Sequence, residues 1–376
     1  MNFNYYLPVN LSFGSGRSGE IGKTCMKYGK KVFLVTGQNS TKKSGLLEKT
    51  ISLIKTEGGE YILFDKVLPN PLTTTAEEGA KLAVSEGCDV VLALGGGSII
   101  DAAKGIAFLC KNDGNINDYI YNRQTGSDAL PIVAVPTTCG TGSEGNKYAV
   151  LSNPVTNDKK SLRYNCLIPK ASIIDPILMK TMPKEVLASV GFDALSHNME
   201  AFLAKLSQPI TDAMALEGIR LSGKYLARVY ENYNDDEGWE ALSLASTIGG
   251  MVINSTSVGT PHALEHPASG LRNITHGKGL AALTPVIFKA SIDSNPERFA
   301  IISRLLGGKD ENDCVDTLNK LLEKINLNVT LSEQGIKEDD IPWMCENIMK
   351  VSAPNVSNFT KEFSADEFAE LYRKSL

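Results

Sequence analysis

The chain has 376 residues, which is more than one hydrophobic core usually supports, so we expect two domains. Its 42% hydrophobic and 22% charged residues are typical of a globular protein. A formal net charge of −5 provides no basic surplus for attracting nucleic acid or an anionic membrane, and we expect neither as a partner.

Residues 1–10 show no signal-peptide pattern, and no stretch reaches the ~18 uninterrupted apolar residues of a membrane span. The 7 cysteines are scattered without a C-x-x-C pair, and their number is odd, which favours reduced thiols over a disulfide framework. These features predict a cytoplasmic protein.

The first half of the chain alternates short apolar runs with helical patterns, which is typical of a doubly wound, mostly parallel sheet. Strands are expected at 31–36, 61–64, 89–94 and 131–135, and helices at 46–55, 75–86 and 98–110. Ligands bind such sheets beyond the carboxyl ends of the strands, so the loops at those ends are candidate binding sites.

A glycine triplet, Gly95-Gly96-Gly97, lies between a buried strand and a helix, as a phosphate-binding loop requires. Ser98 is a natural N-cap for that helix, with Asp101 as its capping partner. A strand-to-helix turn without a ligand gives the same pattern, because neither G-x-G-x-x-G nor a Walker sequence is present. The loop 136–144, rich in threonine and glycine, adds donors beside the triplet and favours phosphate binding.

After residue 176 the pattern changes to long helical periodicities with no convincing strand. Ser364 and Glu367 form a capping box, so we expect the chain to end on a helix. The sequence therefore predicts an α/β domain over residues 1–180 and an all-helical domain over residues 181–376.

Only 4 histidines are present, and all lie in the predicted helical domain. Asp193 and His197 are four residues apart, which places both side chains on one face of a helix, and His262 and His266 repeat that spacing. His276 follows. A single histidine is usually structural, but a carboxylate with several imidazoles indicates a divalent ion. Nitrogen and oxygen ligands without a thiolate suit Fe²⁺ or Zn²⁺.

The sequence contains five stretches that form a specific combination: LPNPLTT (68–74), CDVVLALGGGSIIDAAKGIA (88–107), PTTCGTGSE (136–144), GFDALSHNMEAF (191–202) and HALEHPASGLRNITHG (262–277). Together they resemble the iron-containing (group III) alcohol dehydrogenase family over the whole chain. The resemblance implies a dehydroquinate synthase-like architecture with a cofactor and a metal between its two domains. It also implies NAD(P)-dependent interconversion of a small alcohol and its aldehyde or ketone, with the metal polarising the substrate oxygen.

The functional residues of the family carry over position by position. The metal ligands fall on Asp193, His197, His262 and His276, with Fe²⁺ favoured and Zn²⁺ as the alternative. His266 matches a position near the nicotinamide that assists proton transfer or positioning, and it is the candidate catalytic residue. The cofactor contacts fall on Asn70, Gly96, Gly97, Ser98, Asp101, Thr137, Thr138, Thr141 and Lys159, the last of them a ribose contact. Because family members usually assemble at least as dimers, we expect a homodimer or a larger homo-oligomer.

The chain departs from the family pattern beside the histidines. Glu265 replaces the small residue that the family usually carries within HALEH, and residues 267–274 also lack the usual pattern. Both departures lie where substrate specificity would be set. A substrate typical of the family should therefore not be assumed for this chain.

The loop 37–43 bears on the choice of cofactor. In dinucleotide folds an acidic residue hydrogen-bonds the adenosine 2′-hydroxyl and repels a 2′-phosphate, and in this family it typically lies just after the strand that ends here at Thr36. The loop, with Gly37 and Asn39 as cofactor contacts, contains no carboxylate and ends in Lys42 and Lys43. These lysines equally suit a solvated helix start. We predict a preference for NADP(H) over NAD(H).

Three other functions fit parts of the sequence. HALEH satisfies the H-x-x-E-H pattern of a metallohydrolase, but that function leaves the glycine and threonine loops unexplained. A hydroxyacid–oxoacid transhydrogenase could use the same scaffold with a tightly retained cofactor. A non-catalytic family member is disfavoured, because the set of metal ligands is intact. The substrate and the direction of the reaction stay open.

Overall fold

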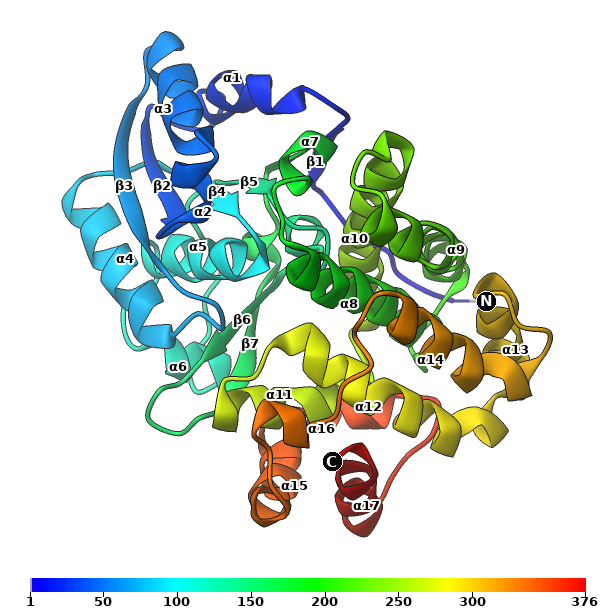
Figure 1. Cartoon of the computed structure of the whole chain (residues 1–376). Coiled ribbons are helices and arrows are strands. Elements are labelled where there is room, and N and C mark those ends of the chain that lie inside the picture. Colours follow the sequence, from blue (N-terminus) through cyan, green and yellow to red (C-terminus); the bar gives the residue numbers. More distant parts are fainter. Residues whose placement is uncertain (1) are drawn as a thin grey trace.

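A parallel six-stranded sheet, in the order β1-β8-β5-β4-β2-β3, forms the centre of the amino-terminal half (Figure 1). The computed structural model describes residues 2–376. The strands of the sheet are β1 (Asn10–Phe13), β2 (Lys31–Gly37), β3 (Glu60–Val67), β4 (Val90–Gly95), β5 (Ile132–Pro136) and β8 (Ala171–Ile174). Strands β6 (Tyr148–Ser152) and β7 (Lys159–Arg163) pair as a separate antiparallel hairpin. The helices of this half are α1 (Ile21–Cys25), α2 (Ser40–Lys43), α3 (Leu46–Thr56), α4 (Thr73–Ser85), α5 (Gly97–Leu109) and α6 (Ile116–Ile120).

Both faces of the sheet are buried, because successive side chains of a strand point in opposite directions. Val32 and Leu34 of β2 enter a core shared with α1 and α3. Phe33 and Val35 enter a second core shared with α4 and α5. Strands buried on both faces read as continuous apolar runs, as the sequence showed. The predicted doubly wound sheet is therefore confirmed.

The sequence analysis missed β1, β8 and the β6–β7 hairpin. Strands β1 and β8 have only 4 residues each, and the pairing of β1 with β8 joins segments far apart in the chain. The hairpin strands have only 5 residues each (YAVLS and KKSLR), and the second contains a single apolar residue. Short runs of this kind give too little periodicity to distinguish a strand from a loop.

The strand order changes direction between β2 and β4. After β2 the chain passes to β3 on one side, then crosses to β4 on the other side of β2. Loops at the carboxyl ends of two such strands diverge and leave a crevice, where ligands of open α/β sheets bind. Here the two loops begin at Gly37 and Gly95, so the fold places both predicted cofactor segments at one crevice.

The carboxyl-terminal half is helical, and no strand follows β8 in the described part of the chain. Its helices are α7 (Pro176–Met179), α8 (Lys184–Leu203), α9 (Pro209–Glu231), α10 (Asp236–Thr256), α11 (Thr260–Arg272), α12 (His276–Ser291), α13 (Pro296–Leu305), α14 (Cys314–Lys324), α15 (Ile341–Val351), α16 (Ala353–Asn358) and α17 (Ala365–Ser375). The predicted capping box of Ser364 and Glu367 starts α17 and is confirmed. Within residues 2–376, no single helix is long and apolar enough to cross a membrane, although the bent pair α10 and α11 passes that test jointly.

The amino-terminal segment crosses from the sheet to the helices (Figure 1). The Tyr5 hydroxyl donates to the Met214 sulfur at 3.7 Å, and the Asn254 amide donates to the Tyr6 carbonyl at 3.1 Å. The first residues therefore lie along α9 and α10, while β1 lies in the sheet. The domain boundary near residue 180 stays a prediction.

Two glycines bring the sheet half and the helical half into backbone contact. Gly142, in the threonine-rich loop after β5, has a φ of +57° and lies against Gly250 of α10. A Cβ atom on Gly250 would lie 1.8 Å from the Gly142 carbonyl oxygen, so no other residue fits without a backbone shift. This contact sets how closely the loop approaches the helices.

We expect Gly250→Ala to lower the free energy of unfolding by about 1–3 kcal/mol, because the added methyl group forces two backbones apart. The midpoint of denaturant unfolding measures the change. Gly19→Ala is the matched control, because a Cβ there meets no atom within 4 Å. Equal stability of the two variants would contradict the close-contact explanation.

Candidate metal and cofactor site

Three helices bring the predicted metal ligands together. Helix α8 carries Asp193 and His197 one turn apart, and it is buried along nearly its whole length. Helix α11 carries His262 and His266 on its inner face, and α12 begins at His276. Between α11 and α12 the chain turns at Asn273, which has a φ of +51°. This sharp turn brings His276 back beside the histidines of α11.

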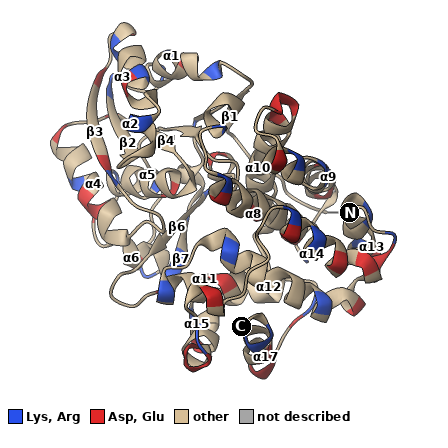
Figure 2. Cartoon of the chain, in the orientation of Figure 1, with Lys and Arg blue, Asp and Glu red and all other residues tan. Residues whose placement is uncertain are grey.

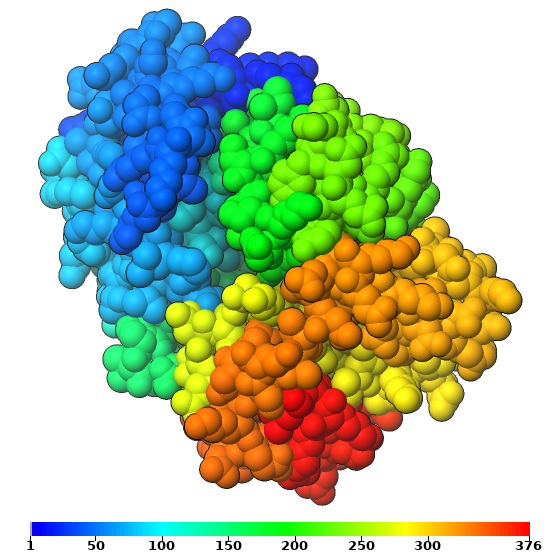
Figure 3. All heavy atoms as spheres, in the orientation of Figure 1, coloured from blue at the N-terminus to red at the C-terminus, as the bar shows by residue number. Residues whose placement is uncertain are grey.

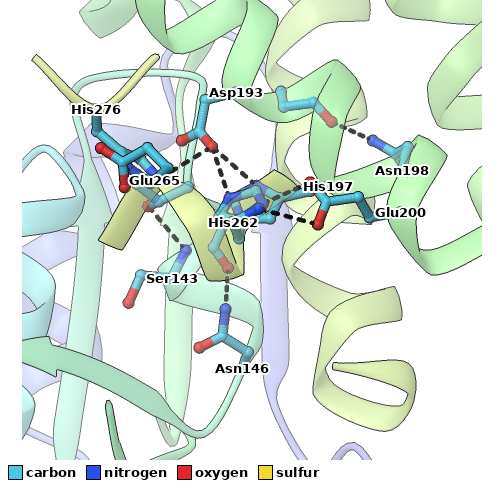
Figure 4. A network of polar contacts seen from close by, with 12 residues as sticks. Ser143, Asn146, Asp193, His197, Asn198, Glu200, His262, Glu265 and His276 are labelled. Carbon is cyan, nitrogen blue, oxygen red and sulfur yellow. Dashed lines mark hydrogen bonds and ion pairs between the residues drawn. The ribbon is translucent and has the colours of Figure 1, made fainter. Parts of the chain in front are cut away.

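One carboxylate oxygen faces three imidazoles (Figure 4). Asp193 Oδ1 lies 3.4 Å from His262 Nε2, 3.5 Å from His197 Nδ1 and 3.6 Å from His276 Nε2. Among the described residues, Asp193 Oδ1, His197 Nδ1 and His262 Nε2 are buried without a hydrogen-bond partner. Buried polar atoms are almost always paired, so several unpaired atoms around one point require an explanation.

A divalent ion accounts for these unpaired atoms. Donor atoms of Asp193, His262 and His276 all lie within 4.8 Å of one another, as a shared ion requires. His197 lies outside this group of three, but its ring stacks on that of His262 with centroids 4.5 Å apart. Oxygen and imidazole donors are also the types that bind iron or zinc. The residues present therefore fit a metal ion.

The charges around the centre stabilise a cation there. Burial alone would raise the pKa of Asp193, but His197 and His276 lower it far below its usual value, so the carboxylate is ionised. Burial would lower the pKa of His262, but Glu200 and Asp193 raise it to about 10, so these carboxylates favour a positive charge on this ring, and a bound divalent ion would take the place of the proton on Nε2. By contrast, burial lowers the pKa of His197 to about 4, which leaves a neutral imidazole suited to binding a metal.

Two further carboxylates contact the outer nitrogens of the imidazoles. Glu200 Oε1 lies 2.6 Å from His262 Nδ1, and Glu200 Oε2 accepts the backbone N–H of Gly259 at 2.8 Å. Glu265 Oε2 lies 2.5 Å from His276 Nδ1. A carboxylate behind a histidine fixes its ring orientation and leaves the other nitrogen to face the ion. The sequence analysis had assigned Glu200 no role.

Glu265 lies beside the candidate metal ligands but outside the substrate cavity. It is fully buried and does not line the cavity beside the histidines, so it is not in contact with a substrate there. Its carboxylate faces His276 and also Lys159, whose Nζ lies 3.6 Å away. Burial would raise the pKa of Glu265, but His276 and then Lys159 lower it well below its usual value. The departure from the family pattern therefore lies behind a candidate ligand rather than on the substrate side.

A cavity of about 140 Å³ opens beside the histidines, between the two halves of the molecule. In Figure 3 a furrow separates the blue-to-cyan amino-terminal part from the green helices. The site residues predicted from the sequence that line the cavity are Asn70, Gly97, Ser98, Asp101, Thr141, Lys159, His197, His262, His266 and His276. Those that do not line it are Gly37, Asn39, Gly96, Thr137, Thr138 and Asp193.

The glycine loop packs against the threonine loop at one end of the cavity. A Cβ on Gly97 would lie 2.4 Å from the Thr141 side chain, and one on Gly96 would lie 2.9 Å from the Thr138 hydroxyl. The predicted cap at Ser98 is wrong. Helix α5 begins one residue earlier with Gly96 as its N-cap and no side-chain cap, which leaves its first N–H groups free to bind an anion.

Asp101, the expected capping partner, is used elsewhere. Its carboxylate accepts the Ser143 hydroxyl at 2.5 Å and the Val150 backbone N–H at 3.0 Å. It is buried, so these donors satisfy it inside the protein rather than at the helix start. Asp101 therefore holds the threonine loop and the hairpin beside α5.

Lys104 has no assigned role in the sequence analysis, yet it organises the same region. Its fully buried Nζ donates to the carbonyl oxygens of Ser143, Asn146 and Tyr148 at 2.7, 2.9 and 2.8 Å. Burial lowers the pKa of Lys104 to about 8. A lysine among the apolar and small residues of α5 was the signal in the sequence, but its acceptors lie about forty residues away in the chain.

The two remaining cofactor segments lie at the ends of the crevice. Gly37 ends β2, and Asn39 precedes α2 at an exposed position. Lys42 is ion-paired with Asp65 of β3. The Asn70 amide donates to Asn273 Oδ1 at 2.8 Å, so it joins the loop after β3 to the turn between α11 and α12.

Two family models match the chain. Residues 8–176 match the model described as iron-containing alcohol dehydrogenase, and residues 187–376 match the carboxyl-terminal model of the same family. The chain belongs to the iron-containing alcohol dehydrogenase family. Its reaction is therefore the oxidation of alcohols or the reduction of aldehydes, and the family implies a divalent metal and a nicotinamide cofactor.

Relatives and solved structures agree with this family. A 1,3-propanediol dehydrogenase of Citrobacter freundii is 32% identical, with 99% of this chain and 98% of the relative covered. An NAD-dependent methanol dehydrogenase of Bacillus methanolicus is 32% identical, with 92% of each covered. The crystal structure of an archaeal halo-thermophilic alcohol dehydrogenase from a Red Sea brine pool matches with a TM-score of 0.96 and 34% identity, covering 100% of this chain and 99% of that one.

Proposed function

We propose that Asp193, His197, His262 and His276 bind one divalent ion, and that the cavity beside them binds a nicotinamide cofactor and a small alcohol or aldehyde. One observation carries the proposal: three imidazole nitrogens lie 3.4–3.6 Å from one buried carboxylate oxygen that has no hydrogen-bond partner among the described residues. Fe²⁺ is the favoured ion because of the family, and Zn²⁺ would suit the same donors.

When bound, the ion supplies a Lewis acid for the substrate oxygen and the nicotinamide carries the hydride. The chain itself supplies the binding geometry. The free N–H groups at the start of α5 face the cavity and suit the cofactor phosphates. Lys159 lines the cavity beside His276 at 3.5 Å, where it would contact a ribose hydroxyl.

The metallohydrolase alternative loses support from the position of Glu265. A general base must reach a water molecule in the cavity, but Glu265 does not line the cavity and is engaged by His276 and Lys159. The names of relatives point to short diols and alcohols, such as 1,3-propanediol and methanol. A small, neutral or singly charged substrate suits the cavity. The homodimer stays a prediction.

We expect His276→Ala to lose its metal, because one of the donors is removed and Asp193 is left facing two imidazoles. Loss of a residue that supports a metal ligand from behind lowers metal affinity roughly 10- to 100-fold, so loss of the ligand His276 itself should lower it further. Metal content after gel filtration, measured by elemental analysis, tests this directly, and circular dichroism confirms that the variant is folded. Full activity of the wild-type enzyme after complete chelation would contradict the proposal.

His266 is proposed as a residue beside the ion rather than a fifth ligand. Its ring centroid lies 6.2 Å from that of His262 and 6.0 Å from that of His276, and the ring lines the cavity. Burial lowers its pKa well below the usual value, so the imidazole is neutral. A neutral imidazole facing the cavity can position the substrate or pass on a proton.

For His266→Ala we predict full metal content with activity reduced on the order of 10²-fold or more. Metal analysis and steady-state kinetics on the same preparation separate the two effects. A variant that loses its metal together with its activity would identify His266 as a ligand instead.

The preference for NADP(H) over NAD(H) stays a prediction, and two observations act against it. Several relatives are named as NAD- or NADH-dependent, and Lys42 is paired with Asp65. Lys43 is exposed and has no ion pair among the described residues, so it remains available to a 2′-phosphate. Gly37 also leaves space, because a Cβ there has its nearest neighbour, Ile99 Cδ1, at 3.4 Å.

Gly37→Asp should shift cofactor selectivity toward NADH, because the new carboxylate would accept the 2′-hydroxyl and repel a 2′-phosphate. The ratio of kcat/KM for NADPH to that for NADH, on one aldehyde, measures the shift. Gly37→Asn is the uncharged control of the same size. A wild-type preference for NADH, or no shift with Asp, would show that this loop does not distinguish the two cofactors.

A further inference from the structure

The β6–β7 hairpin turns a polar face toward the cavity. Side chains of a strand alternate between two faces, so Lys159, Ser161 and Arg163 of β7 share one face. The paired residues Tyr148 and Val150 of β6 lie on the same face, opposite Arg163 and Ser161. All five line the cavity, and β7 carries a cluster of basic residues (Figure 2).

The two cations on this face differ in how their charges are balanced. The Lys159 ammonium lies 3.6 Å from the buried carboxylate of Glu265, so its charge is neutralised within the protein. Arg163 has no ion pair and no side-chain hydrogen bond with any residue that the structure describes. Its guanidinium lies 5.9 Å from the centre of the Tyr148 ring, which holds it over the cavity wall. Arg163 therefore presents unused donors to the cavity.

Two lysines lie near Arg163. The pKa of Lys147 is lowered mainly by burial and, to a smaller extent, by the positive charge of the Arg163 guanidinium. The same two causes lower the pKa of Lys160. Three cations thus lie close together, and none of them forms an ion pair among residues 2–376, while the Asp158 carboxylate favours the charge of Lys160 from a longer distance. Such a cluster attracts an anion to the one member that faces the cavity.

A second unpaired donor lines the same cavity. Asn355, in α16, is only 3% exposed, and its Oδ1 accepts the Ser257 hydroxyl at 3.2 Å. Its Nδ2 has no acceptor within the described chain. This nitrogen is not fully enclosed by the protein, so a ligand in the cavity can accept its hydrogen bond. Arg163 and Asn355 come from segments far apart in the sequence, yet both border this cavity.

We propose that Arg163 and Asn355 bind an anionic group on the substrate, so that the preferred substrate is an aldehyde or alcohol that also carries a terminal carboxylate or sulfonate. The inference rests on the proposed function, because it takes the metal centre as the site of the reacting oxygen. Lys159 lies beside His276, and four residues of strand to Arg163 span about 13 Å along the backbone. The arginine side chain is long and shortens the distance that the substrate must bridge, so the anionic group lies at the end of the substrate opposite to the reacting carbon. A guanidinium offers the planar pair of donors that both groups accept.

The test compares aldehydes of similar length. We expect kcat/KM for 4-oxobutanoate or 3-oxopropane-1-sulfonate to exceed that for butanal, and the better of the two identifies the anionic group. Arg163→Gln should reduce this advantage on the order of 10- to 100-fold, because charge-assisted hydrogen bonds are lost. Arg163→Lys should retain part of it. Lys147→Gln should reduce the advantage much less than Arg163→Gln, since Lys147 carries the same charge and lies 5.8 Å from the same Tyr148 ring but does not line the cavity, so it acts on the anion only from a distance.

A binding measurement keeps the inference separate from turnover. We expect 4-hydroxybutanoate, but not 1-butanol, to raise the melting temperature of the wild-type protein, and Arg163→Gln to remove this stabilisation. If no aldehyde is turned over but the stabilisation behaves in this way, the proposed function fails and the anion site stands. Equal kcat/KM for butanal and both anionic aldehydes would overturn the inference. So would an equal loss on all three substrates in Arg163→Gln, which would instead assign Arg163 to the cofactor.

Discussion

The arrangement of this site depends on one buried carboxylate, Asp193, surrounded by imidazoles. An ionised carboxylate is costly to bury unless positive charge or donors compensate it. Here three imidazole nitrogens surround Oδ1 without a hydrogen bond of normal geometry, and a cation bound at the proposed centre would complete the compensation. Because α8, α11 and α12 each contribute to this point, the centre also fixes how these three helices meet.

The second constraint is the close approach of the two halves. The threonine-rich loop after β5 contacts α10 through Gly142 and Gly250, and Lys104 collects the carbonyl oxygens that follow in the same loop. The Asn70 amide adds a link to the turn before α12. These contacts bring the start of α5, where an anion can bind, beside the histidines. Under the proposed function the cofactor and the substrate must be adjacent for hydride transfer, and the loop contacts would provide that proximity.

Carboxylates behind the histidines extend the same electrostatic arrangement outward. Glu200 supports His262, while Glu265 lies between His276 and Lys159. Neutralisation of Lys159 by Glu265 leaves Arg163 as the uncompensated cation of the cavity wall. The residue that departs from the family pattern thus affects the charge of the cavity without entering it.

The sequence by itself determined the elements whose signals are local. The apolar runs of β2 and β4 identified a doubly wound sheet, since strands buried on both faces need continuous apolar residues. The four-residue spacing of Asp193 and His197 identified one helix face, because that spacing is fixed by helix geometry. The glycine triplet likewise marked the start of α5, although the capping residue was misplaced by two positions.

Only the tertiary structure decided which residues far apart in the sequence come into contact. The sequence contained Glu265 but could not show that it turns away from the cavity toward His276 and Lys159. It also gave no sign of β1, β8 or the hairpin that carries Arg163, because these short strands are stabilised by their pairing partners rather than by their own periodicity. Lys104 and Asn355 have roles that depend on acceptors and cavities built from other parts of the chain. Long-range packing sets these contacts, and a local pattern of residues does not encode it.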